Sequence, residues 1–303
     1  MNREQVLCDV CPKFCKLREG QIGFCRARSN IGGKIVPINY GQATSLALDP
    51  IEKKPLMRFC SGTYILSYGS YGCNLRCPYC QNASISMAGP DNCPHRLITP
   101  EGLTDLAVDL SRQEPGNIGV AFTYNEPTVC FEFIRDTSKL LHEAGLKSVV
   151  VTNGGLVRKY ADELLPHVDA LNIDLKGFSD EFYRYVKGEF DTVKEFIKAA
   201  VEHECHVELT TLVIPTKNDD PEEMEREVEW ITSISPEIPL HLSRFFPRYK
   251  VDDLPPTPAE TIYRLKDIAQ KKLKYVYTGN LLVSVLCFLV TQSIRALEAL
   301  VPR

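Results

Sequence analysis

Residues 64 to 80 read YILSYGSYGCNLRCPYC. The stretch opens with the apolar, β-rich run Tyr64 to Tyr68, which predicts a strand. It continues into a loop that carries Cys73, Cys77 and Cys80, so that three thiols follow the strand at spacings of four and three residues. Their side chains can converge on one small object. We therefore expect a strand followed by a metal-binding loop.

Downstream of this loop, short apolar runs alternate with amphipathic stretches of helical period. Strands are predicted at 118–123, 148–152, 170–174, 207–214, 239–242 and 275–277. Helices are predicted at about 100–113, 128–144, 156–165, 191–204, 221–233 and 258–270, with N-caps at Thr99 and Asp191 and a helix end at Gly145. This alternation predicts parallel strands joined by helical crossovers, hence an α/β sheet. Periodicity alone does not separate an open sheet from a barrel.

Functional side chains of α/β folds gather beyond the carboxyl ends of the strands. The polar residues at the predicted ends are Gly72 to Cys80, Asn125, Glu126, Asn153, Asp174, Lys176, His241 and Arg244. Taken singly, each could be a cap or turn residue. The regular recurrence of acids, amides and a histidine favours a functional site.

Three cysteines are one short of a closed structural zinc site, which takes four ligands. A four-iron cluster held by three thiolates keeps one iron open, and chemistry or a second cofactor enters there. We therefore favour a 4Fe-4S cluster on the three-cysteine loop. A zinc site that borrows Cys93 or His95 as its fourth ligand is the alternative.

The spacing Cys-x3-Cys-x-aromatic-Cys after the first strand resembles the signature of radical SAM enzymes. The resemblance implies a partial (β/α)6 TIM-like barrel with a small Cys-rich N-terminal lobe. It also implies that S-adenosylmethionine binds the open iron of the cluster. The cofactor is then cleaved reductively, and a 5′-deoxyadenosyl radical abstracts hydrogen from a substrate, so the chain is expected to be a radical SAM oxidoreductase.

The resemblance also assigns residues of the S-adenosylmethionine pocket. Residues 124–127 fall where many members of the superfamily have Gly-Gly-Glu, and of these only Glu126 matches. Residues 152–154 resemble the Thr-Asn-Gly motif of glycyl-radical activating enzymes, and residues 174–176 resemble their Asp-Leu-Lys motif. The cofactor-binding residues implied in this way are Tyr79, Glu126, Asn153, Asp174, Lys176 and His241.

Long collinear strings, among them residues 49–56, 122–128 and 241–247, resemble the radical SAM member of the AmmeMemoRadiSam system, which is akin to pyruvate formate-lyase activating enzymes. The resemblance implies AMMECR-like and Memo-like partners or a glycyl-radical enzyme, together with an electron donor such as flavodoxin or ferredoxin. Hydrogen abstraction from a glycine, as in glycyl-radical enzyme activation, is the alternative to an unidentified substrate. A non-catalytic iron-sulfur or zinc binding module is the rival from another class, and the strand-end residues argue against it.

The N-terminal region carries a second group of thiols. Cys8, Cys11, Cys15 and Cys25 offer four thiolates within 18 residues, enough for a zinc ion or an auxiliary iron-sulfur cluster. A Cys-, Gly- and Pro-rich lobe of this size needs such a staple. If the lobe is independent of the core, loss of Cys11 leaves the radical SAM cluster intact.

Three segments are expected: a Cys-rich metal-binding lobe over 1–60, the radical SAM core over 61–280, and an atypical apolar tail over 281–303. The tail contains the ten-residue run LLVSVLCFLV, which is shorter than the roughly 20 residues that span a bilayer. Cys93, Cys130, Cys205 and Cys287 are interpreted as small buried hydrophobic side chains.

Composition describes an ordinary globular chain of 303 residues, 44% hydrophobic and 24% charged. Its net charge of -4 favours neither nucleic acid nor an anionic membrane as partner. The first residues lack a secretory signal pattern, so a cytoplasmic location with reduced thiols is expected. Six basic residues, Lys53, Lys54, Arg58, Arg244, Arg248 and Lys250, are interpreted as a solvated rim rather than a substrate entrance, except that Arg244 follows a strand end.

Overall fold

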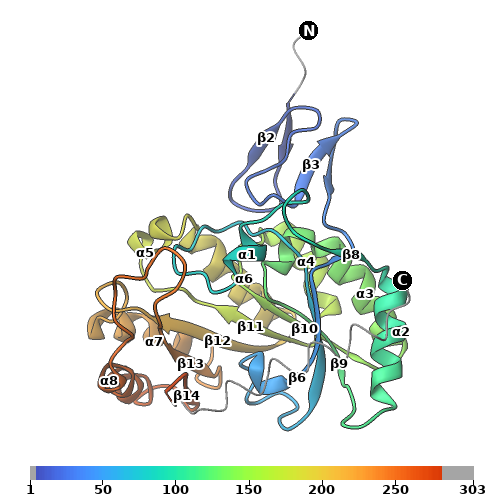
Figure 1. Cartoon of the computed structure of the whole chain (residues 1–303). Helices are drawn as coiled ribbons and strands as arrows, with labels where there is room; N and C mark the ends of the chain where they lie inside the picture. The colour runs from blue at the N-terminus through green and yellow to red at the C-terminus, as the bar shows by residue number, and fades with distance from the viewer. Residues whose placement is uncertain (1–4, 282–303) are drawn as a thin grey trace.

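The computed structural model describes residues 5–281, and its main feature is an eight-stranded sheet (Figure 1). The order of the strands is β14-β13-β12-β11-β10-β9-β7-β6. Their bounds are β6 (Ser45–Pro50), β7 (Tyr64–Gly69), β9 (Gly119–Phe122), β10 (Lys147–Thr152), β11 (Ala170–Asp174), β12 (His206–Val213), β13 (Leu240–Arg244) and β14 (Val276–Gly279). The seven strands from β7 onward are parallel, and β6 pairs antiparallel with β7 at one edge.

From β7 to β14 the strands lie side by side in chain order, and a helical crossover makes each step. The crossover helices are α2 (Pro100–Ser111), α3 (Phe131–Glu143), α4 (Arg158–Leu164), α6 (Phe190–Glu202), α7 (Pro221–Ile234) and α8 (Ala259–Ala269). Because successive right-handed crossovers all step in the same direction along the sheet, every crossover helix lies on the same face. The sheet curls with its other face inward. Within residues 5–281 the edge strands β6 and β14 do not pair. The predicted α/β partial barrel is thus confirmed.

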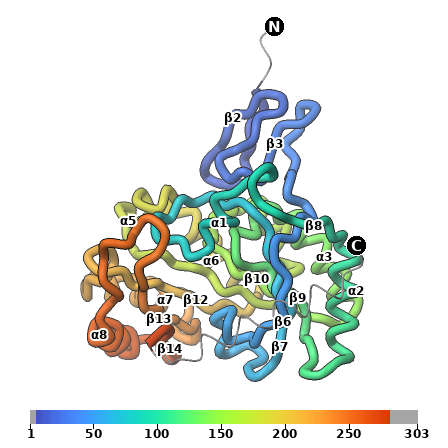
Figure 2. The backbone as a smooth tube through the Cα atoms, viewed as in Figure 1, coloured from blue at the N-terminus to red at the C-terminus, as the bar shows by residue number. Residues whose placement is uncertain are grey.

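The remaining elements are short. They are β1 (Val6–Cys8), β2 (Cys15–Leu17), β3 (Arg28–Ile31), β4 (Lys34–Pro37), β5 (Gln42–Ala43), β8 (Arg96–Leu97), α1 (Ala83–Ser86), α5 (Asp180–Tyr185) and the 3-10 turns η1 (Ile51–Lys53), η2 (Pro127–Cys130) and η3 (Leu165–His167). The antiparallel pairs β1-β2 and β3-β4 form a lobe that projects from the body of the molecule (Figures 1 and 2).

β6 belongs to the main sheet, although it falls within the predicted lobe. The three-segment division stays a prediction, and the tail beyond residue 281 lies outside the described residues.

Helix boundaries test the predicted caps. Thr99 caps α2, because its Oγ1 accepts a hydrogen bond from the Gly102 amide at 3.1 Å. Gly145 follows α3 with a φ of +73°, as a helix end requires. The prediction of Asp191 as an N-cap is wrong, since α6 begins one residue earlier at Phe190. Phe190 stacks on Tyr183 with ring centroids 5.0 Å apart, and this tertiary packing accounts for the earlier start.

The two faces of the sheet differ in chemistry because side chains alternate along each strand. Apolar residues on the convex face, such as Leu66 and Phe122, belong to the core cluster that includes the helices. The concave face is apolar near the amino ends of the strands, where Ile51 and Leu56 pack on residues of four strands. Farther along, this face carries Ser67, Asn172, Glu208, Thr210 and His241, all buried. Polar chemistry is therefore directed into the barrel.

Glu227 of α7 lies beneath the convex face. Burial raises the pKa of its carboxyl to about 8, although a hydrogen bond with Thr211 lowers it. Thr211 Oγ1 lies 2.6 Å from Glu227 Oε1 and 3.0 Å from the Leu175 carbonyl oxygen. One hydroxyl proton cannot serve two acceptors, so the arrangement favours a neutral Glu227 that donates to Thr211.

Replacing Glu227 with glutamine is expected to stabilise the fold at pH 7 to 8. The raised pKa means that the folded state holds a proton that the unfolded state releases, so stability falls as pH rises from about 4.5 to about 8. Glutamine keeps the donor and removes this loss, a gain of up to about 4 kcal/mol at pH 8. Urea unfolding at pH 5 and pH 8 measures the effect, and equal gains at both pH values would contradict it.

None of the helices within residues 5–281 is both long enough and apolar enough to cross a membrane.

Candidate cofactor site

The three-cysteine loop leaves the carboxyl end of β7 and folds over the rim of the barrel. Cys73 and Cys77 are buried and Cys80 is half-buried. Burial raises the pKa of Cys77 to about 11, and the nearby ammonium of Lys176 is the largest effect that lowers it. At neutral pH the Cys77 thiol is therefore protonated, and it would ionise only against a stronger positive charge such as a bound metal.

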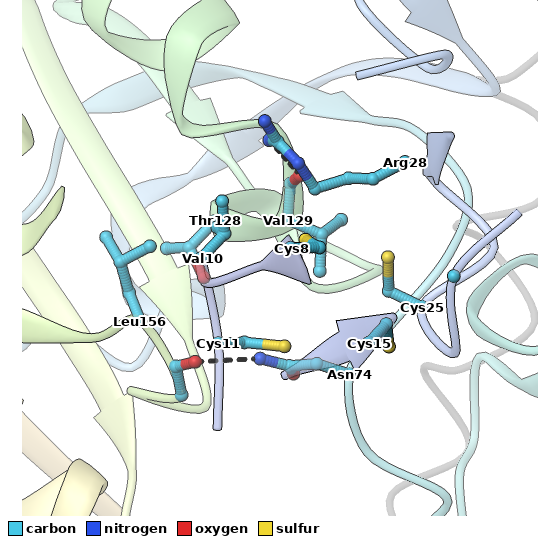
Figure 3. Close-up of a pocket in the computed structure, with 12 residues that line it drawn as sticks. Cys8, Val10, Cys11, Cys15, Cys25, Arg28, Asn74, Thr128, Val129 and Leu156 are labelled. Atoms are coloured by element: carbon cyan, nitrogen blue, oxygen red, sulfur yellow. Dashed lines mark hydrogen bonds between the residues drawn. The ribbon is translucent and has the colours of Figure 1, made fainter. Parts of the chain in front are cut away.

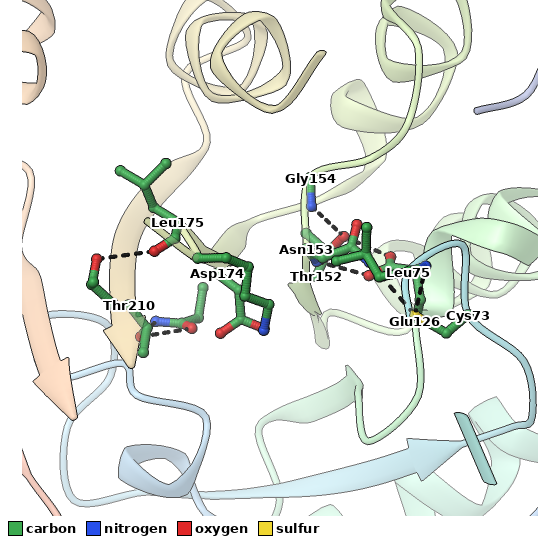
Figure 4. Close-up of polar contacts among 12 residues, drawn as sticks. Cys73, Leu75, Glu126, Thr152, Asn153, Gly154, Asp174, Leu175 and Thr210 are labelled. Atoms are coloured by element: carbon green, nitrogen blue, oxygen red, sulfur yellow. Dashed lines mark hydrogen bonds and ion pairs between the residues drawn. The ribbon is translucent and has the colours of Figure 1, made fainter. Parts of the chain in front are cut away.

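Glu126 lies behind this loop and links β9 to β10 (Figure 4). Its Oε1 accepts from the Thr128 amide and hydroxyl and from the Thr152 hydroxyl, at 3.0, 2.6 and 2.6 Å. Its Oε2 accepts from the Asn153 amide at 2.7 Å. Burial raises the pKa of Glu126, and these donors oppose the rise. Both carboxylate oxygens are occupied, so in this structure Glu126 positions Asn153.

Asn153 faces the cysteine loop directly. Its Nδ2 donates to Asn74 Oδ1 at 2.8 Å and lies 3.7 Å from Cys73 Sγ. Asn74 in turn donates to the Gly155 carbonyl at 2.9 Å. From the sequence, Asn74 was predicted only as part of the loop as a whole. Its bridging position depends on contacts between residues about 80 apart in the chain.

Asp174 ends β11, and Lys176 follows it toward the other two thiols. Lys176 Nζ donates to Asp174 Oδ2 at 2.8 Å, and their side chains are 17% and 33% exposed. Burial opposes the charge of Lys176, but the charges of Asp174 and Cys77 outweigh it and raise the pKa of the ammonium. A partly exposed carboxylate with a free oxygen can accept a hydrogen bond from a ligand.

Tyr79 is buried between the loop and α5, with its ring 6.2 Å from that of Tyr185. Its hydroxyl lies near the Cys77 thiol and has no nitrogen or oxygen hydrogen-bond partner among residues 5–281. A buried hydroxyl with only a thiol beside it fits a loop that receives a further group. The donor set is thus suited to an iron-sulfur cluster.

His241 occupies β13 in register with Thr210 and, one strand further, Asp174. Its Nε2 lies 2.6 Å from Glu208 Oε2, and its ring stacks on Tyr277 at 5.2 Å. Glu208 is fully buried and also accepts from the Met57 and Arg58 amides. Glu208 was not predicted from the sequence, although it lies two residues before Thr210 in the same strand and therefore on the same, concave face.

The interpretation of Lys54 as a solvated rim residue is wrong. Lys54 is 2% exposed, and its Nζ donates to Asp49 Oδ2 at 2.9 Å. The same oxygen accepts from the Ser67 and Tyr124 hydroxyls, both at 2.9 Å. The turn at 51–53 folds back against the barrel and carries Lys54 inward, which a local charge count does not reveal.

The four thiols of the N-terminal lobe line one cavity (Figure 3). Cys8, Cys11 and Cys25 are buried, and burial raises the pKa of each thiol. Among residues 5–281, no three His, Cys, Asp or Glu side chains are arranged closely enough to hold a metal ion as they stand. The donor chemistry fits a thiophilic metal, and the thiols would have to draw together to bind it.

The lobe is not independent of the core, so loss of Cys11 is not expected to leave the three-cysteine loop undisturbed. The Cys73 amide donates to the Cys25 carbonyl at 3.1 Å, and the Val157 amide donates to the Val10 carbonyl at 3.1 Å. Arg28, 4% exposed, forms a bidentate ion pair with Glu132 of α3 at 2.9 and 2.6 Å. The lobe and the three-cysteine loop therefore belong to one packed unit.

Comparison with known proteins agrees with this geometry. Residues 67–228 match the family model of the radical SAM superfamily. The chain belongs to the radical SAM superfamily. This radical SAM protein is 41% identical to an uncharacterized protein of Methanocaldococcus jannaschii over 282 residues, which are 92% of this chain and 83% of that protein. It is 30% identical to the pyruvate formate-lyase-activating enzyme of Clostridium pasteurianum over 172 residues, which are 54% and 67% of the two chains.

Among solved structures, a radical SAM methyltransferase from Sphaerobacter thermophilus is similar with a TM-score of 0.54 at 15% identity. The match covers 71% of this chain and 66% of that one, and it shows the fold. Membership of the radical SAM superfamily implies S-adenosylmethionine and a 4Fe-4S cluster as cofactors. The roles of individual residues in binding them stay predictions.

Replacing Glu126 with glutamine is expected to destabilise the protein by about 2 kcal/mol. The amide NH2 group would face hydrogen-bond donors that now share a carboxylate. Thermal unfolding of the cluster-free protein measures this cost. Glu163→Gln is the matched control, because Glu163 lies half-exposed on α4. Equal stability of the two variants would contradict the prediction.

Proposed function

We propose that this chain is an enzyme that holds a 4Fe-4S cluster on Cys73, Cys77 and Cys80 and cleaves S-adenosylmethionine reductively. The supporting observation is the three-thiol loop at the end of β7, beside the polar ends of β9, β10 and β11. Cys73, Cys77 and Cys80 would hold the cluster, which would supply one electron for cleavage of the C5′–S bond of the cofactor into methionine and a 5′-deoxyadenosyl radical able to take a hydrogen atom from the substrate.

The residues around the loop would bind and orient the cofactor. Asp174 offers a partly exposed oxygen to the ammonium or a ribose hydroxyl, while Lys176 neutralises thiolate charge. Asn153 offers its amide beside Cys73. Tyr79 forms an apolar wall with α5 and His241 lies deeper on the concave face, so both would contact the nucleoside. Burial of the thiols excludes water from the reacting centre.

The substrate is proposed to be a C–H group of a protein or small molecule. Similarity to pyruvate formate-lyase-activating enzymes supports a glycine Cα–H as the alternative, with a glycyl-radical enzyme as partner. Collinear strings support placement in the AmmeMemoRadiSam system, with AMMECR-like and Memo-like partners. An electron donor such as flavodoxin or ferredoxin would reduce the cluster.

Anaerobic assay of the full chain tests the proposal. The protein is reconstituted with iron and sulfide, reduced with dithionite and given S-adenosylmethionine, and 5′-deoxyadenosine is measured by liquid chromatography. We expect deoxyadenosine above the level of a protein-free control. A wild-type protein that holds a reducible cluster yet forms none would overturn the proposal and favour a non-catalytic iron-sulfur module.

A further inference from the structure

We propose that Cys8, Cys11, Cys15 and Cys25 bind one Zn²⁺ ion, and that this site holds the three-cysteine loop in position. The zinc site goes beyond the proposed function. The effect of the zinc site on the three-cysteine loop deepens the proposed function. Whether that effect matters for catalysis rests on the proposed function.

Strand pairing brings the first two ligands together. β1 and β2 form a hairpin in which Cys8 lies directly opposite Cys15. Directly opposed side chains have Cβ atoms about 5 Å apart, which suits two ligands of a single ion. Cys11 lies in the connection between the strands, and Cys25 comes from the next turn of the lobe. In Figure 3 the four sulfur atoms surround a common space.

The donor set favours zinc over other ions. Four thiolates close a tetrahedral site, and the Cys-x2-Cys spacing of Cys8 and Cys11 is one that zinc sites use. The Phe24 amide already donates to Cys15 Sγ at 3.4 Å, which stabilises a thiolate. The lobe consists of short strands and turns, so a metal that draws the thiols together would provide the stability that its small core does not.

The lobe cavity and the three-cysteine loop share backbone contacts. The Cys73 amide donates to the carbonyl of Cys25 at 3.1 Å. Gly72 has a φ of +91°, and a Cβ there would lie 2.6 Å from the same carbonyl oxygen. The guanidinium of Arg76 lies 4.0 Å from the Phe24 ring centroid and donates to the Phe24 carbonyl.

Asn74 completes the connection, because it lines the lobe cavity and also accepts from Asn153 at 2.8 Å. Fixing Cys25 on a metal therefore fixes the backbone from which the three-cysteine loop begins. Loss of the metal should free the amides of residues 72–77.

The test uses the full chain purified without iron or sulfide, so the radical SAM cluster is absent throughout. Elemental analysis is expected to find one zinc per chain in the wild type and at least a tenfold loss in Cys11→Ser. Hydrogen exchange at residues 72–77 is expected to be about tenfold faster in Cys11→Ser. Cys205→Ser is the matched control, since Cys205 is also buried but donates to Leu165 in the core. It should keep both the zinc and slow exchange.

Cys15→His is a control for misfolding, because histidine is also a zinc ligand and Cys15 is half-buried. It should retain zinc and slow exchange at residues 72–77. Protection of β11 and β12 reports whether the core of each variant stays folded.

Wild-type protein without zinc, or iron that requires these four cysteines, would overturn the zinc assignment. Zinc loss with unchanged exchange at residues 72–77 would overturn the coupling. Neither readout involves cleavage of S-adenosylmethionine, so failure of the proposed enzymatic function leaves both results interpretable.

Discussion

Replacing Cys77 with alanine is expected to abolish both the iron-sulfur cluster and the formation of 5′-deoxyadenosine. Two remaining thiolates would have to hold four irons, and Cys77 occupies the middle of the loop beside Lys176. The cluster absorption and EPR signal of the reduced, reconstituted protein should fall to background. Deoxyadenosine should fall to the level of a reaction without protein.

Cys93→Ala is the control for this experiment. Cys93 is buried beside Tyr71 and Ala88 and has no role in the proposed cluster. We expect it to keep the cluster and the cleavage activity. If the loop were a zinc site that borrows a fourth cysteine, loss of Cys93 would release the metal instead. A Cys77→Ala protein that keeps the wild-type cluster absorption would contradict the proposal that this loop holds the iron-sulfur cluster.

Replacing Asp49 with asparagine is expected to cost about 3 kcal/mol of unfolding free energy. The change leaves the Lys54 ammonium buried without a counter-charge, while the shape of the side chain is kept. It also weakens the acceptor for Ser67 and Tyr124. Urea unfolding of the cluster-free protein at pH 7 measures the loss.

The pH dependence of the same variant is a second readout. Burial opposes ionisation of Asp49, but the charge of Lys54 and hydrogen bonds from Lys53 and Lys54 outweigh it and lower the pKa of this carboxyl. A lowered pKa gives stability that is present above the unfolded pKa of about 3.9 and is lost as pH falls through the folded pKa. The wild type should therefore lose its advantage over Asp49→Asn on acidification.

Lys53→Ala separates the buried ion pair from surface charge. Lys53 contacts the same carboxylate at 3.0 Å but is 46% exposed, so its removal should cost under about 1 kcal/mol. If Lys53→Ala and Asp49→Asn lowered the unfolding free energy by similar amounts, burial of Lys54 would not explain the cost of Asp49→Asn.

Strands and crossover helices were predictable because their signals are local. The run at 170–174 was placed with its observed bounds, and Thr99 caps α2 as expected. A β-branched run or a cap residue influences the backbone conformation of only the few residues around it, so a single sequence is enough to predict these elements. Asp191 failed as a cap because Phe190 is stacked on Tyr183, 7 residues away, and that packing decides where α6 begins.

Other features depended on distant pairing. β6 reads as part of a Cys-rich lobe, yet it pairs with β7 at the edge of the main sheet. Lys54 reads as a surface lysine, yet the turn before it folds inward against Asp49. Glu208 and His241 come from neighbouring strands and meet only when those strands are in register. No local pattern specifies such contacts.

The sequence by itself determined the α/β class, the three-thiol loop and the alignment of polar residues with strand ends, because these follow from periodicity and spacing along one chain. Only the tertiary structure decided that both oxygens of Glu126 are occupied, that Asn74 bridges to Asn153, and that Cys25 supports the backbone of Cys73. Those contacts join segments brought together by sheet curvature and lobe docking, and hydrogen bonds act only over about 3 Å.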